Sequence, residues 1–176
     1  NYADGYFIDD MTGQTLDTKL VIKARMEEMA TYFNHHAYDK VPIEECWKAT
    51  GKAPIGSRWI DINKGDDENP EYRSRLVAKE INKSPSDEMF AATPPLEAKK
   101  MLFSMAVTEF ANHRTRYARG TQKLLFIDVR RAYFYAPARR PVFVTLPDED
   151  AKPGYCAKLN VSMYGTRGAA SNWEEK

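Results

Sequence analysis

The pattern of apolar positions becomes regular from residue 16, where it is helical. Asp17 or Thr18 is a suitable N-cap, and the charged residues between 19 and 28 would form a solvated face. The opposite face carries apolar side chains at helical spacing, which we expect to be buried: Ile22, Met26, Met29, Ala30 and Phe33.

The residues before this helix are polar and rich in turn-forming types. They include Phe7-Ile8-Asp9-Asp10, and tandem aspartates after apolar residues can bind metal ions. Because Thr12 and Gly13 follow at once, we expect no second strand to complete a hairpin here. Residues 1–14 are therefore predicted to be a solvated turn before the helix.

Alternation with a period of two predicts a β-hairpin in the middle of the chain. The first strand covers residues 57–62, a polar turn follows, and the second strand runs from Tyr72 to Lys79. On the second strand Arg73, Arg75, Val77 and Lys79 share one face, and Leu76 and Ala78 share the other. The three cations suit either a solvated edge that resists aggregation or a clamp for phosphate oxygens.

The second half of the chain alternates short helices and strands. The run 123–128 is apolar without alternation, which predicts a strand buried on both faces. A helix is expected from a Thr93 cap to Asn112, with Ala98, Leu102, Met105, Ala106 and Phe110 buried. Residues 37–56 are expected to be a connection with short extended pieces, and further short elements are expected over 130–135, 142–146, 155–161 and from Ala169 onward.

Composition and charge narrow the class of protein. Hydrophobic residues are 43% and charged residues 29% of the 176 residues, with a net charge of +1, which excludes an acidic disordered chain or a strongly basic tail. Cys46 and Cys156 lack metal-ligand spacing and are expected to be buried thiols in a reducing compartment. No apolar run approaches the ~20 residues that span a bilayer, and no signal-peptide pattern is present. Because the chain begins at Asn1 and ends inside a predicted helix, we expect it to be a piece of a longer polypeptide.

Asp128 is the leading candidate for chemistry. It closes the predicted buried strand, where an uncompensated charge is costly, so either bound Mg²⁺ or the neighbouring arginines would have to balance it. Tyr133 follows one to two helical turns later, where its ring could pack on a sugar or simply join the core. The sequence shows no Ser–His–acid motif, glycine-rich phosphate loop or zinc pattern.

Five stretches in order carry a resemblance to a known family. The chain resembles the reverse transcriptase domain of Ty1/copia-type retrotransposon polyproteins over roughly residues 20–176. The matching stretches are Ser57-Arg58-Trp59-Ile60, Arg75-Leu76-Val77-Ala78-Lys79, Phe90-Ala91-Ala92-Thr93-Pro94, Asp128-Val129-Arg130-Arg131-Ala132-Tyr133-Phe134, and Tyr164-Gly165 through to Trp173.

The resemblance implies an α+β right-hand polymerase with fingers and an incomplete palm, an antiparallel sheet with helices on one face. Residues 1–15 would be a polar leader, 16–122 a fingers-like region with helices and a β-hairpin, and 123–176 a partial palm. The implied activity is RNA-directed DNA polymerisation by two-metal nucleotidyl transfer. The implied partners are an RNA or DNA template with its primer, a dNTP and the remainder of the polyprotein, without a membrane. The implied location is intracellular, in the cytoplasm, a virus-like particle or the nucleus.

The resemblance also implies roles for individual residues. Asp128 would be the first catalytic metal ligand, helped by the Val129 carbonyl, with two Mg²⁺ ions in the complete enzyme and Mn²⁺ as an alternative. Arg75 and Lys79, with Arg73, would hold the incoming triphosphate. Tyr133 would lie under the sugar and discriminate against a 2′-hydroxyl.

Departures from the family pattern leave alternatives open. Gly165-Thr166-Arg167-Gly168 stands where the family has Gly-Leu-Lys-Gln, and Glu80-Ile81 stands where it has Gly-Phe. A Tyr-x-Asp-Asp hairpin is expected downstream of residue 176, so we expect these residues alone to lack polymerase activity; primer extension with Mg²⁺ and dNTP would refute this. The alternatives are a decayed or domesticated derivative that binds nucleic acid without catalysis, and an unrelated metal-dependent phosphohydrolase with further carboxylates around Asp128.

Overall fold

The computed structural model describes residues 6–80, 94–107 and 125–175. The chain divides into two compact units, Asn1–Phe90 with Arg131–Lys176, and Ala91–Arg130. Within the described ranges no helix is both long and apolar enough to cross a membrane. The smaller unit contains α3 (Leu96–Val107). The larger unit contains, in chain order, β1 (Phe7–Ile8), β2 (Thr15–Leu16), α1 (Thr18–Asn34), β3 (Tyr38–Pro42), α2 (Ile43–Thr50), β4 (Ser57–Asn63), β5 (Tyr72–Ala78), η2 (Ala132–Tyr135), β6 (Phe143–Val144), η3 (Asp148–Asp150), β7 (Tyr155–Leu159) and α4 (Ala169–Glu174).

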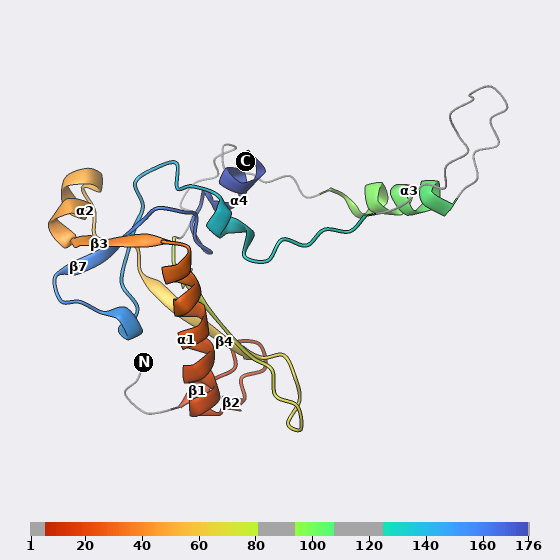
Figure 1. The fold of residues 1–176 in the computed structure, drawn as a ribbon, viewed down its shortest axis with the longest axis horizontal. Coiled ribbons are helices and arrows are strands. Elements are labelled where there is room, and N and C mark those ends of the chain that lie inside the picture. Colours follow the sequence, from red (N-terminus) through yellow and green to blue (C-terminus); the bar gives the residue numbers. More distant parts are fainter. Residues whose placement is uncertain (1–5, 81–93, 108–124, 176) are drawn as a thin grey trace. The chain divides into compact units, whose positions relative to one another are not determined.

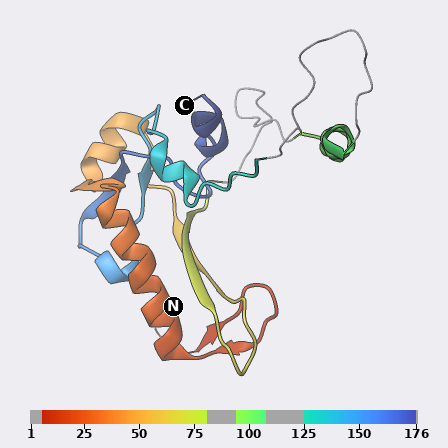
Figure 2. The ribbon, with the colours of Figure 1, turned by 45° about the vertical axis from the view of Figure 1, so that its right-hand side comes forward.

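The described residues form a mixed α+β fold built on small antiparallel sheets, as predicted at the level of fold class. β4 and β5 form a long hairpin, β3, β7 and β6 form a three-stranded sheet in that order, and β1 pairs with β2. Helix α1 packs along β5, and the β1–β2 ribbon contacts β4 (Figures 1 and 2). The larger unit is therefore organised around one helix and one hairpin.

The β4–β5 hairpin confirms the predicted division of faces. Its register pairs Ser57 with Ala78 and Asn63 with Tyr72, and residues 64–71 make the polar turn. Side chains that point to the helix side of β5 are buried, whereas Arg73 is exposed and Arg75 half-buried. The strand thus anchors one face in the core and presents its arginines on the other.

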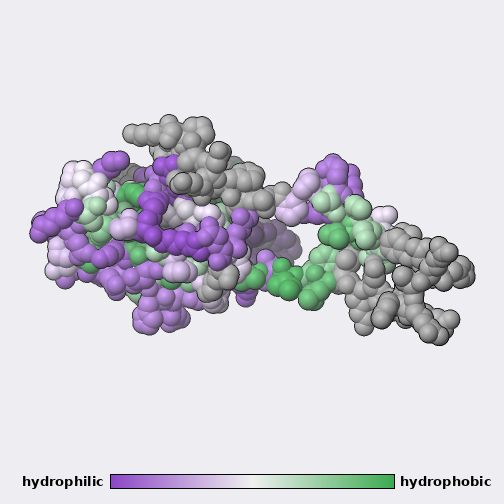
Figure 3. Space-filling model, turned by 90° about the horizontal axis from the view of Figure 1, so that it is seen from above, coloured by the Kyte–Doolittle hydropathy of each residue, from purple (hydrophilic) through white to green (hydrophobic). Residues whose placement is uncertain are grey.

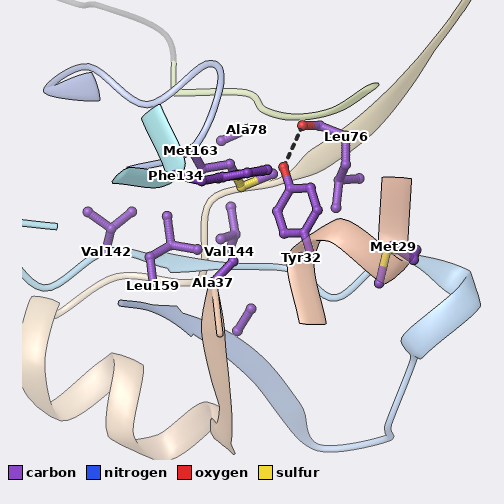
Figure 4. Packing of buried hydrophobic residues seen from close by; sticks show 11 residues of the cluster. Met29, Tyr32, Ala37, Leu76, Ala78, Phe134, Val142, Val144, Leu159 and Met163 are labelled. Carbon is purple, nitrogen blue, oxygen red and sulfur yellow. Dashed lines mark hydrogen bonds between the residues drawn. The ribbon is translucent and has the colours of Figure 1, made fainter. Parts of the chain in front are cut away.

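The core of the larger unit is formed by side chains from both ends of the chain. The Tyr32 hydroxyl donates to the Leu76 carbonyl at 2.9 Å, as Figure 4 shows, and burial raises the pKa of Tyr32 well above its ordinary value. The ring of Phe134 packs edge-on against Tyr32 with centroids 4.7 Å apart. These contacts fix η2, which follows Asp128 in the chain, against α1 and β5. Other members of this core are Met29, Ala37, Ala78, Val142, Val144, Ala157, Leu159 and Met163.

Helix α1 begins where predicted but buries a different face. Asp17 is the N-cap and accepts from the Leu20 N–H at 3.0 Å. The predicted buried face is wrong apart from Met29, because Ile22, Met26, Ala30 and Phe33 are all exposed. The residues that are buried on α1 are Val21, Ala24, Arg25, Glu28, Met29, Thr31 and Tyr32.

Ion pairs explain why the charged residue Arg25 of α1 lies inside. The Arg25 guanidinium donates to both oxygens of Asp61, through Nε at 3.2 Å and a terminal nitrogen at 2.5 Å. It also donates to Glu149 at 3.3 Å. A buried guanidinium with matched carboxylates avoids the cost of an unpaired charge, so Arg25 can occupy the helix face that packs on the hairpin.

The polar segment before α1 forms a hairpin, which corrects the prediction of no second strand. Phe7 pairs with Leu16 and Ile8 with Thr15, and Phe7 and Leu16 are buried with Val21. One Asp9 carboxylate oxygen accepts from the backbone N–H groups of the turn that follows, and the other accepts from Asn63 N–H at 2.7 Å. Asp9 therefore closes a turn and ties the ribbon to β4, roles that sequence alternation does not reveal.

Residues 37–56 contain an extended piece, as predicted, and also a helix that was not predicted. β3 pairs with β7, and α2 ends at Gly51, whose left-handed φ of 64° is typical of a helix C-cap. Cys46 and Cys156 are free, buried and packed with Phe143, as expected of buried thiols. Burial, with the neighbouring Cys46, raises the pKa of Cys156 to about 11.

The short elements near the end of the larger unit are confirmed, with one reduced in length. η2 lies within the predicted 130–135, and α4 starts at Ala169. β7 covers most of the predicted strand 155–161, whereas the predicted strand 142–146 is confined to Phe143–Val144. Both β6 residues are buried, so this strand shows no half-buried alternation.

The smaller unit contains the largest disagreement with the sequence prediction. Residues 125–129 form no strand, and Leu125, Phe126 and Ile127 are 81%, 73% and 75% exposed. A strand needs a neighbour for its backbone hydrogen bonds, and the described residues supply none to this segment. Residues 123 and 124 lie outside the described residues.

Helix α3 also leaves its apolar side chains exposed. Leu102 and Met105 were predicted to be buried, but both are exposed, as are Leu96, Met101 and Phe103. The rings of Phe103 and Phe126 stack with centroids 5.8 Å apart, and apolar surface of this unit is visible at the right of Figure 3. The Thr93 cap, Phe110 and the helix end at Asn112 lie outside the described residues.

Candidate functional site

A cavity lined by three arginines, the arginine cavity, lies at the edge of β5, beside α1. Its volume is about 70 Å³, and Arg73, Arg75 and Arg131 line it together with Glu27, Glu28 and Tyr164. A cavity of ~10–15 Å³ is enough to hold one water, so this space admits a group of the size of a phosphate. The cavity is therefore a place where a polyanion could bind by one end.

Arg73 and Arg75 reach the cavity because they share one face of β5. Residues two apart on a strand point to the same side, and the intervening Ser74 and the following Leu76 anchor the strand in the interior. Guanidinium groups offer several planar donors in a fixed geometry that matches phosphate oxygens. Of the three cations predicted to share this face, Arg73 and Arg75 line the cavity.

Arg131 joins them from a distant part of the chain. Its backbone is left-handed, with φ 56°, immediately before η2. Its guanidinium donates to a carboxylate oxygen of Glu28 at 3.1 Å. Because a non-glycine residue in this conformation costs of order 1 kcal/mol, surrounding contacts must hold it there.

Glu28 provides the negative charge among these cations. Its side chain is 6% exposed, and burial raises the pKa of its carboxyl above the ordinary value. Arg131, Arg75 and Arg73 act in the opposite direction and favour the charged form. The sequence predicted that Glu28 lies on a solvated helix face. This prediction is wrong, because the side chain is buried at the cavity.

Tyr164 connects the arginines to Tyr133. The Arg75 guanidinium carbon lies 5.3 Å from the centre of the Tyr164 ring, a cation–π distance. The Tyr133 ring meets the same Tyr164 ring edge-on at 5.1 Å. Tyr133, which is half-buried, thus packs against a ring that lines the cavity.

A glycine turn fixes Tyr164 in this position. The Ala78 N–H donates to the Tyr164 carbonyl at 2.8 Å, and Gly165 follows with φ 79°. A Cβ at Gly165 would lie 2.1 Å from the Ala78 carbonyl oxygen, so only glycine permits this close approach. The Tyr-Gly pair was noted in the sequence, but its contact with the end of β5 required the fold.

Lys79 lies apart from the cavity. Its backbone N–H donates to the Gly56 carbonyl at 2.7 Å. Its side chain lies over Gly56, since a Cβ there would come within 3.0 Å of the Lys79 Cε. The structure thus brings Arg73 and Arg75 together at the cavity and leaves Lys79 at the neighbouring edge of the hairpin.

Asp128 and Val129 belong to the smaller unit, and Asp128 is exposed. The idea that burial forces this carboxylate to take a metal therefore does not hold, because water can solvate it. Among the described residues no three His, Cys, Asp or Glu side chains are grouped as a metal site. The described carboxylates do not form a two-metal centre by themselves.

Comparison with known proteins assigns the family. A family model described as reverse transcriptase (RNA-dependent DNA polymerase) matches residues 45–176, more than half of the chain. The chain belongs to the reverse transcriptase family. No curated protein and no solved structure matches it significantly.

The matched range includes most of the residues discussed above. β4, β5, Asp128, Tyr133 and Tyr164 all lie within this reverse transcriptase match. It begins at residue 45, so α1 and its buried Glu28 lie outside it. The cavity is thus built from reverse transcriptase motifs on one side and from α1 on the other. Metal cofactors are general in the family, and Asp128 remains the predicted ligand in this chain.

Proposed function

We propose that the chain is part of an RNA-directed DNA polymerase of a Ty1/copia-type retrotransposon, and that the arginine cavity holds the triphosphate of an incoming dNTP. The observation that supports this most is the meeting of three separate sequence motifs. Arg75, Tyr133 and Tyr164 come from different motifs and form one row of contacts beside the cavity. A phosphate between the arginines would leave the sugar toward Tyr133, consistent with a role in excluding a 2′-hydroxyl.

Asp128 opens the stretch Asp128-Val129-Arg130-Arg131-Ala132-Tyr133-Phe134 that carries the family resemblance, and it lies within the range of the reverse transcriptase match. We propose that Asp128 and the Val129 carbonyl hold one metal ion in the complete enzyme, where two Mg²⁺ ions, or Mn²⁺, support nucleotidyl transfer.

The assignment of regions follows from the same proposal. The β4–β5 hairpin and α1 would belong to the fingers within residues 16–122, and residues 123–176 would begin the palm. Lys79 would contact the triphosphate from the hairpin edge. Template and primer, together with the rest of the polyprotein, would complete the enzyme inside the cell, in the cytoplasm, a virus-like particle or the nucleus.

One alternative keeps the nucleic-acid contacts without the chemistry. A decayed or domesticated derivative would also bind polyanions at the arginines, and the exposed, ungrouped Asp128 is compatible with it. A Tyr-x-Asp-Asp motif in the parent reading frame favours the polymerase, and its loss favours the derivative. Nothing in the described residues supports a phosphohydrolase, which would need further carboxylates near Asp128.

Equilibrium binding of a dNTP in Mg²⁺ to the 176-residue chain tests the proposed site. A hydrogen bond to a charged group contributes about 1.5–3 kcal/mol, so Arg73→Ala or Arg75→Ala should weaken binding roughly tenfold or more. Arg58→Ala is the matched control, since this exposed arginine pairs with Asp10 and does not line the cavity. Equal affinity of the Arg73, Arg75 and Arg58 variants would refute the assignment.

A further inference from the structure

Glu28 has the features of a built-in substitute for a phosphate. Its carboxylate is almost fully buried, lines the arginine cavity and accepts from Arg131. Guanidinium groups bind carboxylate and phosphate oxygens through the same donors and in similar geometry. The group that holds Arg131 in the free protein is therefore chemically similar to the ligand proposed for the cavity.

The charge of the cavity depends on this residue. Three arginines and two glutamates line it, which leaves one net positive charge. Of the two glutamates, Glu27 is exposed to solvent and Glu28 is buried. Because water and salt screen an exposed charge much more than a buried one, Glu28 should have the larger effect on a bound anion.

Arg131 is the side chain best placed to exchange partners. Its side chain is 41% exposed, and the Glu28 carboxylate is the one acceptor seen for it among the described contacts. Its backbone is fixed by the left-handed conformation and by its carbonyl, which accepts from Phe134 N–H at 3.0 Å. The guanidinium can therefore turn toward an arriving anion while the main chain stays in place.

We infer that Glu28 is a positioning residue that holds Arg131 ready at the cavity and competes with the polyanion for it. This inference rests on the proposed triphosphate site and adds an internal competitor that tunes its affinity. When a triphosphate enters, Arg131 passes from Glu28 to a phosphate oxygen.

Calorimetric titration of the 176-residue chain with inorganic triphosphate tests the inference. Glu28→Gln keeps the size and an acceptor for Arg131 but removes the charge, so binding should tighten about tenfold. The salt dependence of binding should also become steeper, because one more net cation is available. Glu27→Gln is the matched control, with the same charge change at the exposed rim and an expected gain below about twofold.

A second variant separates competition from a merely structural role. Arg131→Gly keeps the left-handed backbone accessible and should weaken triphosphate binding severalfold. In that background Glu28→Gln should lose most of its gain, because the contested guanidinium is absent. Where Glu28→Gln alone folds poorly, the double variant is compared with Arg131→Gly: nearly equal triphosphate affinities are expected, and a roughly tenfold tighter double variant would contradict the competition for Arg131.

The outcomes distinguish this inference from the proposed function. If Glu28→Gln folds and binds triphosphate no tighter than Glu27→Gln, while Arg75→Ala abolishes binding, Glu28 is only a brace and the inference is wrong. If Arg73→Ala and Arg75→Ala leave triphosphate binding unchanged, the proposed site itself is wrong.

Discussion

Arg25 is the residue whose loss should damage the larger unit most. Its guanidinium lies between the rings of Phe7 and Trp59, 4.7 and 5.1 Å from their centres. It donates to Asp61 and Glu149, and the three charged side chains are only 5–7% exposed. One side chain thus connects α1, the β1–β2 ribbon, β4 and η3.

Arg25→Ala would remove the cation that pairs with two buried carboxylates, Asp61 and Glu149. Removing one partner of a buried pair typically costs about 3–5 kcal/mol, because the remaining charge is uncompensated. Ser74 and the Trp59 indole still donate to Asp61 and Glu149, which keeps the expected loss near the middle of that range, about 4 kcal/mol. A domain is stable by only about 5–15 kcal/mol, so this variant should be close to unfolding.

Urea unfolding followed by tryptophan fluorescence and circular dichroism measures this loss. With a slope of about 2 kcal/mol/M, the midpoint should fall by roughly 2 M. Arg58→Ala is the control, because its pair with Asp10 is exposed and should contribute less than about 1 kcal/mol. A loss for Arg25→Ala no larger than for Arg58→Ala would refute the view that the buried ion pairs determine which face of α1 is inside.

Two further predictions concern backbone geometry and acid stability. Gly165→Ala should lower the unfolding free energy by more than about 2 kcal/mol in the same urea assay, because its Cβ would overlap the Ala78 carbonyl. Gly13→Ala is the control: Gly13 has a similar φ of 75° but open space around it, so this substitution should cost only about 1 kcal/mol. Hydrogen bonds from Asn63 and the following turn lower the pKa of Asp9 below 3.8, so its contribution is present above that pH and lost as the pH falls through the lower folded-state pKa. Asp9→Asn should therefore be less stable than the natural chain at pH 7, and the gap should close in acid; a gap that stays constant from pH 7 to pH 3 would contradict this.

The strand pattern predicted the structure where geometry leaves few options. On β5 a period of two divides Arg73 and Arg75 from Leu76 and Ala78, and a shift by one residue would bury the arginines. The prediction of the cationic face therefore needed only the sequence. The cavity beside this face could not be predicted in the same way, because its other walls come from α1 and Arg131, which lie in distant parts of the chain.

Helix α1 shows where apolar periodicity is insufficient. Two overlapping faces were available, one with Ile22, Met26 and Phe33, and one with Arg25 and Glu28. The second is buried because its charges pair with Asp61 on β4, with Glu149 on η3 and with Arg131 immediately before η2. Since these partners lie tens of residues away, no local pattern could have selected this face.

The segment around Asp128 shows a different limit. The apolar run before it has the composition of a buried strand, yet residues 125–129 are exposed and pair with no strand among the described residues. Hydrophobicity indicates that a segment prefers burial, but pairing requires a second strand. The predicted role of Asp128 therefore depends on the family resemblance and on its position in the chain, and not on burial.

Two of the departures from the family pattern, at residues 80 and 167, meet in the fold. Glu80 accepts from the Arg167 backbone N–H at 2.8 Å, and Arg140 pairs with the same carboxylate at 2.5 Å. The first contact uses a main-chain group that any residue but proline at 167 would supply, and the second neutralises the charge that replaces a glycine. The first contact joins the end of β5 to the turn at Tyr164, the same two elements that the Ala78 hydrogen bond connects, and the second joins the end of β5 to the segment before β6. The departures at 80 and 167 are therefore accommodated without separating Arg75 from Tyr164, and the wall of the arginine cavity is preserved.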